Sequence, residues 1–402
     1  MNPVEIKPGI YWVGAVDWNL RDFHGYSRAS RGTTYNAYLI LDDKVTLFDT
    51  VDSRFTHELL CQIAQIIDPE KIDQIVVNHC EPDHSGCLSA IVDRIEPEVI
   101  FTSKMGQQFL QGRFHYQNWP VHAVQNKEII SLGKRNVQFL ETRMLHWPDS
   151  MVSFVMEDNL LISQDAFGQN IASSQRFDDW IEWSELKSFM AHYYANIILP
   201  FSGQVPKAIQ AIQDLGWEID MIAPDHGLIL QNNVTNALTA YQEFAAQKPK
   251  PKAVIVYDTM WKSTAAMAES LAAGLSAENL DVRMFAMKSW HHSDVMGELW
   301  DACAVLVGSP THNNGVLPLI ADMLTYMQGL KPQNKIGFAF GSYGWSGESP
   351  KKIAQWLEDM GMELPEETVA VKHVPTHDQA QELFTLGQRL ARQVKDRVAA
   401  SG

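Results

Sequence analysis

Residues 79–84 read HCEPDH, so two imidazoles and two carboxylates stand within six residues, directly after the largely apolar run 72–77. The apolar run predicts a buried strand, and the six residues then occupy the turn at which that strand ends. Buried carboxylates and imidazoles are costly without partners, and ordinary packing does not account for them at this density. The segment therefore predicts a metal site, most economically a pair of metal ions, in a fold that brings further ligands to the same place.

The composition is that of a soluble globular protein large enough for two or three domains. Of the 402 residues, 46% are hydrophobic and 20% are charged, which is ordinary for a folded chain of this size. The net charge of −16 argues against nucleic acid or an anionic membrane as a partner. No apolar run approaches the roughly 20 residues that span a bilayer, and the first residues do not resemble a signal peptide. The four cysteines form no C-x-x-C pair, so we expect a protein of the reducing cytoplasm.

Short strand-like segments dominate the chain before residue 247. Residues 35–41 and 45–48 predict one hairpin, and residues 151–156 and 160–163 predict a second. A further strand is expected at 137–141, and helical patterns at 55–67 and 184–197 are interleaved with the strands. Strands paired in hairpins with helices outside them favour an α+β or layered sandwich fold.

A composition break at residues 247–252, which read QKPKPK, separates this half from the next. Alternating Lys and Pro predicts a solvated linker. Beyond it the pattern is a regular alternation of strands and helices, with strands expected at 253–256, 282–286, 304–307, 336–340 and 369–371, and helices that include 263–275 and 379–398. Five parallel strands with crossover helices predict a doubly wound α/β sheet of flavodoxin size. We therefore expect two domains, residues 1–248 and 249–402.

Three more candidate ligands follow strand-like runs in the first half. His146 follows the strand near 141, Asp165 follows the strand 160–163, and His226 follows the apolar residues 219–223. Sites on sheet-based folds commonly assemble on the loops at strand ends. Three carboxylates and four imidazoles form a mixed set that suits iron or manganese better than zinc. The complete set is His79, Glu81, Asp83, His84, His146, Asp165 and His226.

The ligand pattern is similar to that of the metallo-β-lactamase superfamily, His-x-[His/Glu]-x-Asp-His followed by a distant His, Asp and His. Hydrolases of that superfamily typically have His at the third motif position and bind zinc, whereas this chain has Glu81. With its flavodoxin-like second half, the chain resembles the flavodiiron proteins, also called A-type flavoproteins. Residues 31–39 (RGTTYNAYL) and 146–151 (HWPDSM) extend the resemblance. It implies an N-terminal metallo-β-lactamase-like αββα sandwich followed by a flavodoxin-like doubly wound five-stranded parallel sheet.

The resemblance also implies how the ligands divide between two iron ions joined by an oxo or hydroxo bridge. One iron takes His79, Glu81 and His146; the other takes Asp83, His84 and His226; and Asp165 bridges both.

Four residues outside this set are candidates for roles around the metals. His24 and Tyr194 resemble family positions that line the pocket and donate hydrogen bonds to an iron-bound oxygen species. Asp49 and Asp225 are candidates to accept hydrogen bonds from ligand imidazoles and orient them. The alternative for the first pair is ordinary packing, and for the second pair a turn or capping aspartate. Cys80 is interpreted as a packing residue.

Three loops of the second half predict a flavin site. The first offers hydroxyl and backbone N–H groups at a helix N-terminus, where a phosphate binds well, although Lys262 stands where the flavodoxin pattern has Gly, and Trp261 where it has Thr. The other two follow the third and fourth strands, where doubly wound sheets bind ligands, and Trp345 offers a stacking face. No G-x-G-x-x-G follows the first strand, which favours FMN over a dinucleotide. The predicted residues are Thr259, Met260, Trp261, Lys262, Ser263, Thr264, Pro310, Thr311, His312, Asn313, Asn314, Gly315, Ser342, Tyr343, Gly344, Trp345, Ser346 and Gly347.

The activity that the resemblance implies is that of a terminal reductase, which reduces O2 to water, or NO to N2O, with electrons passed through FMN. The chain lacks the paired C-x-x-C motifs of rubredoxin, so a separate donor such as rubredoxin is expected. A head-to-tail homodimer, or a dimer of such dimers, would bring each flavin to the partner's iron. Two alternatives remain open: a zinc hydrolase with an appended flavodoxin-like domain, and an electron carrier whose metal site is only structural.

Overall fold

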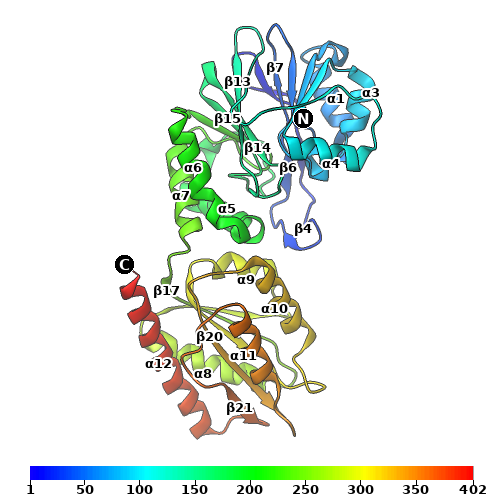
Figure 1. The fold of residues 1–402 in the computed structure, drawn as a ribbon. Helices are drawn as coiled ribbons and strands as arrows, with labels where there is room; N and C mark the ends of the chain where they lie inside the picture. Colours follow the sequence, from blue (N-terminus) through cyan, green and yellow to red (C-terminus); the bar gives the residue numbers. More distant parts are fainter. Residues whose placement is uncertain (402) are drawn as a thin grey trace. The chain divides into compact units, whose positions relative to one another are not determined.

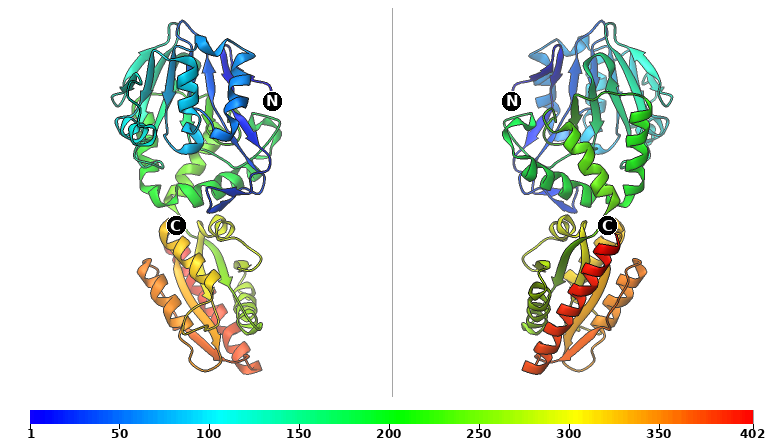
Figure 2. Two further views of the ribbon diagram at one scale, coloured as in Figure 1. Left: turned by 90° about the vertical axis from the view of Figure 1, so that its right-hand side faces the viewer. Right: turned by 90° about the vertical axis from the view of Figure 1, so that its left-hand side faces the viewer.

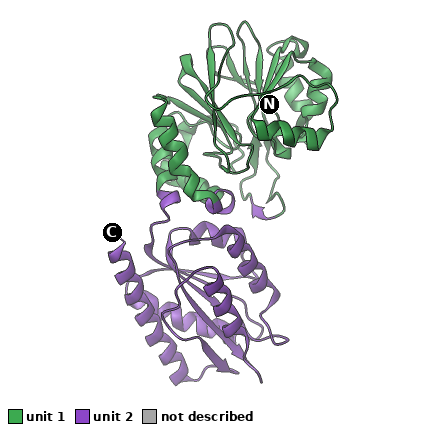
Figure 3. Ribbon diagram, in the orientation of Figure 1, with its two compact units in different colours: residues 1–25, 29–194, 201–242 green, residues 26–28, 195–200, 243–402 purple. Residues whose placement is uncertain are grey.

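A computed structural model describes residues 1–401, which form two compact units (Figure 3). Unit 1 comprises residues 1–25, 29–194 and 201–242, and unit 2 comprises residues 26–28, 195–200 and 243–402. Figures 1 and 2 trace the chain through both units. Within the described residues, no helix combines the length and the apolar composition that a membrane span requires.

Unit 1 contains two mixed β-sheets. The first sheet has the order β1 (Val4–Lys7), β2 (Ile10–Trp12), β7 (Tyr38–Ile40), β8 (Thr46–Phe48), β9 (Gln74–Val77), β10 (Val99–Thr102) and β11 (Val121–Ala123). The second has the order β12 (Ile129–Ser131), β13 (Asn136–Glu141), β14 (Met151–Val155), β15 (Leu160–Gln164) and β16 (Met221–Pro224). The antiparallel pairs β7–β8 and β14–β15 confirm both predicted hairpins. Shorter strands of this unit are β3 (Ala15–Asp17), β4 (Asp22–Phe23) and β6 (Thr33–Tyr35), whereas the short β5 (Ser27–Arg28) belongs to unit 2.

The two sheets of unit 1 share one apolar core, and helices cover their outer faces. Successive residues of β9 point to opposite faces: Val76 lies in the core between the sheets, while Ile75 and Val77 pack in a second apolar cluster. Figure 1 shows α1, α3 and α4 on one side of the paired sheets and α5, α6 and α7 on the other. This is the αββα sandwich that was predicted. The helices are α1 (Thr56–Ala64), α2 (Pro82–Ser85), α3 (Leu88–Ile95), α4 (Lys104–Phe114), α5 (Trp183–Ile197), α6 (Val205–Asp214) and α7 (Val234–Ala246).

Unit 2 is a five-stranded sheet in which every neighbouring pair is parallel. Its order is β18 (Asp281–Ala286), β17 (Lys250–Tyr257), β19 (Ala302–Gly308), β20 (Ile336–Tyr343) and β21 (Val369–Lys372). Ile255 packs in the cluster with α8 and α12, and Val254 and Val256, which point to the opposite face, are also buried. Both faces are therefore covered, as the doubly wound prediction required. The helices are α8 (Ser263–Ala277), α9 (His292–Leu299), α10 (Pro318–Leu330), α11 (Ser349–Asp359) and α12 (His377–Ala400).

The prediction of a linker at residues 247–252 is wrong for its second half, because Lys250, Pro251 and Lys252 begin β17. Pro251 is tolerated there because the register between β17 and β19 shifts between Lys250 and Ala253, and a proline without an N–H fits at such an irregularity. Lys252 is buried but paired, since its Nζ lies 3.1 Å from Asp301 Oδ1. Pairing with the neighbouring strands thus extends β17 into residues whose composition is typical of a linker.

Helix α12 completes one face of the second unit. It packs against α8 at two glycines, where a Cβ would collide with a backbone carbonyl: Gly274 faces Phe384 O, and Gly387 faces Leu271 O. The two glycines therefore set how closely α12 approaches α8.

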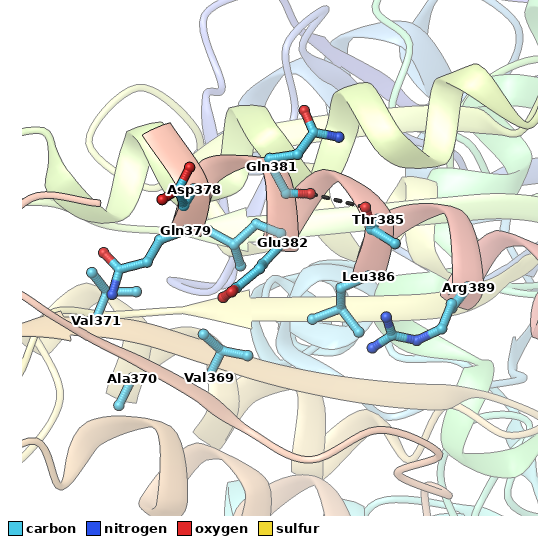
Figure 4. Close-up of a pocket in the computed structure, with 11 residues that line it drawn as sticks. Val369, Ala370, Val371, Asp378, Gln379, Gln381, Glu382, Thr385, Leu386 and Arg389 are labelled. Carbon is cyan, nitrogen blue, oxygen red and sulfur yellow. Dashed lines mark hydrogen bonds between the residues drawn. The ribbon is translucent and has the colours of Figure 1, made fainter. Parts of the chain in front are cut away.

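At the edge of the sheet, a cavity of about 670 Å³ lies between β21 and the first turns of α12 (Figure 4). Val369 and Leu386 line this cavity together with charged side chains of the helix.

A buried lysine stands at the start of β20. Lys335 is only 2% exposed, and its Nζ donates a 2.9 Å hydrogen bond to the carbonyl of Trp300, the residue that ends α9. An ammonium at the carboxyl end of a helix suits the helix dipole. Burial nevertheless lowers the pKa of Lys335 to about 7. Lys335 thus caps α9, and below about pH 7 its side chain carries a buried positive charge that is energetically costly.

We expect Lys335→Met to change how the stability of the protein depends on pH. The folded pKa is about 7 and the unfolded value is 10.5, so between these values the unfolded wild-type chain binds more protons. Wild-type stability should therefore rise with pH in that window, by up to about 1.4 kcal/mol per unit, and the Met variant should lack this rise. Urea unfolding of both proteins near pH 7 and near pH 9 measures the difference. Parallel pH dependence of the two proteins would contradict the assignment.

Candidate functional site

The HCEPDH segment leaves β9 at the predicted turn, and its last residues form the single helical turn α2. Glu81 is the N-cap of α2, and Pro82 occupies the first helical position, where its missing N–H costs nothing. Asp83 and His84 follow on the helix and are buried. The turn therefore presents ligands both before and within the helix.

The seven predicted ligands lie together in two groups, and within each group the candidate donor atoms are within 4.8 Å of one another. The first group is His79, Glu81, His146 and Asp165, and the second is Asp83, His84 and His226. Asp165 also reaches the second group: its Oδ2 lies 2.8 Å from His146 Nε2, while its Oδ1 lies 3.0 Å from His84 Nε2. His226 Nε2 is 3.3 Å from the same Oδ1. One carboxylate thus faces both groups, as a bridging ligand would.

These groups are buried, and several of their polar atoms are unsatisfied. Among residues 1–401, Asp83 Oδ1, Asp165 Oδ1, His84 Nε2 and His226 Nε2 are buried without a hydrogen-bond partner. Each such atom costs about 1–3 kcal/mol when nothing pairs with it. Metal ions would satisfy carboxylate oxygens and imidazole nitrogens together, and the mixed donor set fits iron. The residues therefore fit a pair of metal ions.

Hydrogen bonds between imidazoles and carboxylates shift the pKa values of both kinds of group at this site. Burial raises the pKa of Glu81, but hydrogen bonds with His146 and His79 outweigh burial and lower it to about 2. Burial likewise lowers the pKa of His146, but hydrogen bonds with Asp165 and Glu81 raise it to about 9. Metal ions and protons thus compete for the same nitrogen atoms.

The turn that carries His226 is held by the segment RGTTYNAYL. The side-chain amide of Asn36 and the hydroxyl of Tyr38 each donate a 2.7 Å hydrogen bond to the carbonyl of Pro224. Thr34 Oγ1 accepts a hydrogen bond from Gly227 N at 2.6 Å, and its carbonyl lies 2.7 Å from His226 Nδ1. The segment therefore fixes the ring of this ligand from behind.

Two buried aspartates hold the backbone on either side of His79. Asp49 accepts hydrogen bonds from the backbone and side-chain amides of Asn78, both at 2.7 Å. Asp149 Oδ2 accepts from Cys80 N at 2.7 Å and lies 3.2 Å from His79 Nδ1. The structure thus places Asp49 against the residue before the ligand. Asp149 orients the ring itself, and the only sequence signal for it was its place in the segment HWPDSM.

His24 lies at the rim of the site. Its Nε2 is 2.9 Å from Asp83 Oδ2, its Nδ1 is 3.5 Å from Glu81 Oε1, and its side chain is 24% exposed. Burial lowers the pKa of His24, but the hydrogen bond with Asp83 and the charge of that carboxylate raise it above the usual value. His24 therefore contacts one carboxylate of each ligand group, while its predicted hydrogen bond to an iron-bound oxygen species stays a prediction.

The structure places Tyr193, rather than Tyr194, beside a ligand. The Tyr193 ring centroid is 5.8 Å from that of His226, and its buried hydroxyl has no hydrogen-bond partner among the described residues. The Tyr194 hydroxyl instead donates to Ser202 Oγ at 2.9 Å. Adjacent residues on a helix point about 100° apart, and the sequence did not show which of the two faces inward.

The predicted flavin loops meet at the carboxyl ends of the strands of unit 2. Thr264 Oγ1 lies 2.9 Å from Ser342 Oγ, which joins the first loop to the end of β20. Lys262 has φ +69°, a left-handed conformation that glycine adopts readily, at the position where the flavodoxin pattern has Gly. Trp261 and Trp345 are 85% and 91% exposed. A small cavity is lined by Thr311, Asn313, Asn314, Gly344, Trp345 and Ser346.

Known proteins resemble the chain over its whole length. Residues 33–227 match the ODP family beta lactamase, and residues 255–387 match flavodoxin. A rubredoxin-oxygen oxidoreductase of Megalodesulfovibrio gigas is 52% identical over 100% of both chains, and a nitric oxide reductase of Moorella thermoacetica is 44% identical over 98% of this chain and 99% of its own.

Two solved structures have the same fold throughout. The rubredoxin oxygen:oxidoreductase from the anaerobe Desulfovibrio gigas is 52% identical, with a TM-score of 0.98 over 99% of this chain and 100% of that chain. The flavodiiron protein from Giardia intestinalis is 31% identical, with a TM-score of 0.97 over 100% of this chain and 99% of that chain. These matches confirm the predicted fold in both halves.

We expect Fe²⁺ binding to the metal-free protein to release protons and to become tighter as the pH rises towards about 9. The pKa of His146 is raised, so its ring is protonated at neutral pH, and a metal ion must displace that proton. Anaerobic titration in weak buffer with an indicator dye measures the release. His146→Gln should release fewer protons per metal bound. Binding without proton release at neutral pH would refute the expected competition.

Proposed function

The chain belongs to the flavodiiron protein family, and from that premise we propose that it reduces O2 to water at a pair of non-haem iron ions, with electrons passed through FMN. The proposal of a metal pair rests on the position of Asp165, because each of its two carboxylate oxygens faces one of the two ligand groups. The preference for O2 is supported by the full-length relative at 52% identity, which is named for oxygen.

We assign residues 1–248 to a diiron domain and residues 249–402 to an FMN-binding domain, in keeping with the two family matches. One iron would be held by His79, Glu81 and His146, the other by Asp83, His84 and His226, with Asp165 and an oxo or hydroxo group as bridges. The FMN phosphate would lie at the N-terminus of α8, on the loop Thr259–Thr264, because backbone N–H groups at a helix start bind anions. The flavin ring would lie by Trp345 and the cavity beside it.

When bound, the iron pair supplies two electrons and reduced FMN two more, which equals the four electrons that convert one O2 and four protons into two waters. The side chains of this chain would position the substrate and move the protons. His24 stands at the rim with its Nε2 on Asp83, and its raised pKa keeps a proton available there. The Tyr193 hydroxyl is buried beside the second group and is a second candidate donor. Together they would deliver protons to one side of the site.

NO is the second proposed substrate, because the relative at 44% identity is named a nitric oxide reductase. Two NO molecules, two electrons and two protons give N2O and one water. A hydrolase with zinc in this site is disfavoured by Glu81 and by the flavodoxin-like second half.

We propose rubredoxin or a similar small protein as the electron donor, because the 52% identical relative carries rubredoxin in its name. A head-to-tail homodimer, alone or as a dimer of dimers, is proposed as the assembly that brings flavin and iron together. The exposed rings of Trp261 and Trp345 support a surface that is covered on cofactor or partner binding. Free cysteines at 61, 80, 87 and 303 support a cytoplasmic location.

Asp165→Ala should abolish turnover with both gases while reduction of FMN by the donor continues. The substitution removes the only carboxylate that we assign to both ligand groups, so the two metal ions lose their common ligand. Stopped-flow bleaching of the flavin and an oxygen electrode measure the two steps separately. As a control, Asp179→Ala changes an exposed aspartate on the same unit and should leave both steps unchanged. Continued O2 consumption by Asp165→Ala would show that the flavin alone reacts with oxygen.

The order of the two substrates is tested by anaerobic steady-state assays with one reduced donor and either gas. We expect faster turnover with O2 than with NO at equal gas concentrations, in line with the name of the 52% identical relative. The protein should contain iron and FMN. Faster turnover with NO reverses the order, and a colourless active protein that contains zinc contradicts the proposed function.

A further inference from the structure

Asp225 is a fully buried acid with an unusual lack of partners. Neither of its carboxylate oxygens has a hydrogen-bond partner among residues 1–401. Its Oδ2 lies 3.4 Å from Nδ1 of His84, and that nitrogen is also without a hydrogen-bond partner in the same range. The two groups therefore face each other at contact distance but outside hydrogen-bond geometry. A buried carboxylate in this state is costly unless something pairs with it.

The backbones of both residues are held in place. Asp225 N donates to Gln164 O at 2.9 Å, and Asp225 O accepts from Asn36 N at 2.7 Å. The carbonyl of His84 accepts two hydrogen bonds from Thr50, at 2.9 Å from its N and 2.6 Å from its Oγ1. Only the side-chain torsions are left to adjust. A small rotation of the ring would therefore complete the bond between Nδ1 and the carboxylate.

The opposite nitrogen of His84 points into the metal site. His84 Nε2 lies 3.0 Å from Asp165 Oδ1 and 3.3 Å from Asp83 Oδ1. A metal ion bound there requires a neutral imidazole with its proton on Nδ1, which is the nitrogen that faces Asp225. The positive charge of the metal would also compensate the buried carboxylate behind the ring. Metal binding would thus supply the partner that Asp225 lacks.

His79, in the other ligand group, has a comparable arrangement that is already complete. Its Nδ1 is hydrogen-bonded to Asp149 Oδ2 at 3.2 Å. Asp149 differs from Asp225 because it also accepts a 2.7 Å hydrogen bond from Cys80 N. Asp149 therefore supports the backbone as well as the ring, whereas the Asp225 carboxylate accepts no hydrogen bond from any described residue. The two aspartates form a matched pair, one behind each ligand group.

We propose that Asp225 is a positioning residue for His84: its carboxylate accepts the Nδ1 proton and keeps Nε2 directed at the metal of the second ligand group. The inference rests on the proposed function, because it requires that the site holds two metal ions. It assigns Asp225 to one of the two metals only. Loss of the carboxylate should therefore weaken one binding step and leave the other intact.

The test uses full-length, FMN-loaded, metal-free protein and anaerobic titration with Co²⁺, whose visible absorption reports the ligand set of each ion. In Asp225→Asn, the binding of one Co²⁺ per chain should weaken by about 10- to 100-fold, and its absorption band should shift. The other Co²⁺ should bind as in the wild type. The thermal midpoint of the metal-free variant should equal or exceed that of the wild type, because an unpaired buried carboxylate has been removed.

Asp149→Asn is the matched control. It should weaken the other binding step, and it should lower the thermal midpoint because Cys80 N loses its acceptor. If Asp225→Asn binds both Co²⁺ ions with wild-type affinity, or lowers the metal-free midpoint as Asp149→Asn does, the positioning role is refuted. If the wild type itself binds fewer than two ions per chain, the proposed function fails together with this inference.

Discussion

The two oxygens of Asp165 make the contacts on which the rest of the metal site depends. They lie against ligands from three other segments: the turn after β9, the loop after β13 and the turn after β16. A carboxylate that accepts on both sides can join two ligand groups only if both are brought to the same strand ends. The two sheets of unit 1 achieve this by packing face to face around one core. The packing of the two sheets thus allows the short side chain of Asp165 to contact both ligand groups.

This arrangement places many ionisable side chains close together in the interior of unit 1, which is energetically costly. Seven ionisable candidate ligands are buried within unit 1, with Asp49, Asp149 and Asp225 behind them, and in metal-free protein the candidate ligands stabilise one another through imidazole–carboxylate contacts. Those contacts account for the raised pKa of His146 and the lowered pKa of Glu81. The surrounding backbone is restrained at the same time, as the hydrogen bonds from Asn36 and Tyr38 to Pro224 show. Rigid loops that hold several carboxylates close together favour cations that can neutralise the carboxylates.

The grouping of the seven candidate ligands could be predicted from sequence because each follows a strand-like run, and parallel or paired strands end at common edges. Features that depend on tertiary contacts could not be predicted. Tyr193 and Tyr194 are neighbours, and only the packing of α5 shows which ring meets His226. Lys250 and Pro251 read as linker, but a register shift draws them into β17. Lys262 departs from the Gly of the flavodoxin pattern, but its backbone has the left-handed conformation that glycine adopts readily, which the sequence alone did not show.

The packing of α12 has a consequence for biosynthesis. Leu383, Leu386, Leu390 and Val394 of this helix belong to the same apolar cluster as β17 and α8, which lie more than a hundred residues earlier in the chain. One face of the sheet therefore stays open to solvent until the last turns of α12 have left the ribosome. Unit 1 can close around its core while translation continues. A nascent chain would accordingly fold unit 1 first, and the core of unit 2 would be complete only once α12 has emerged.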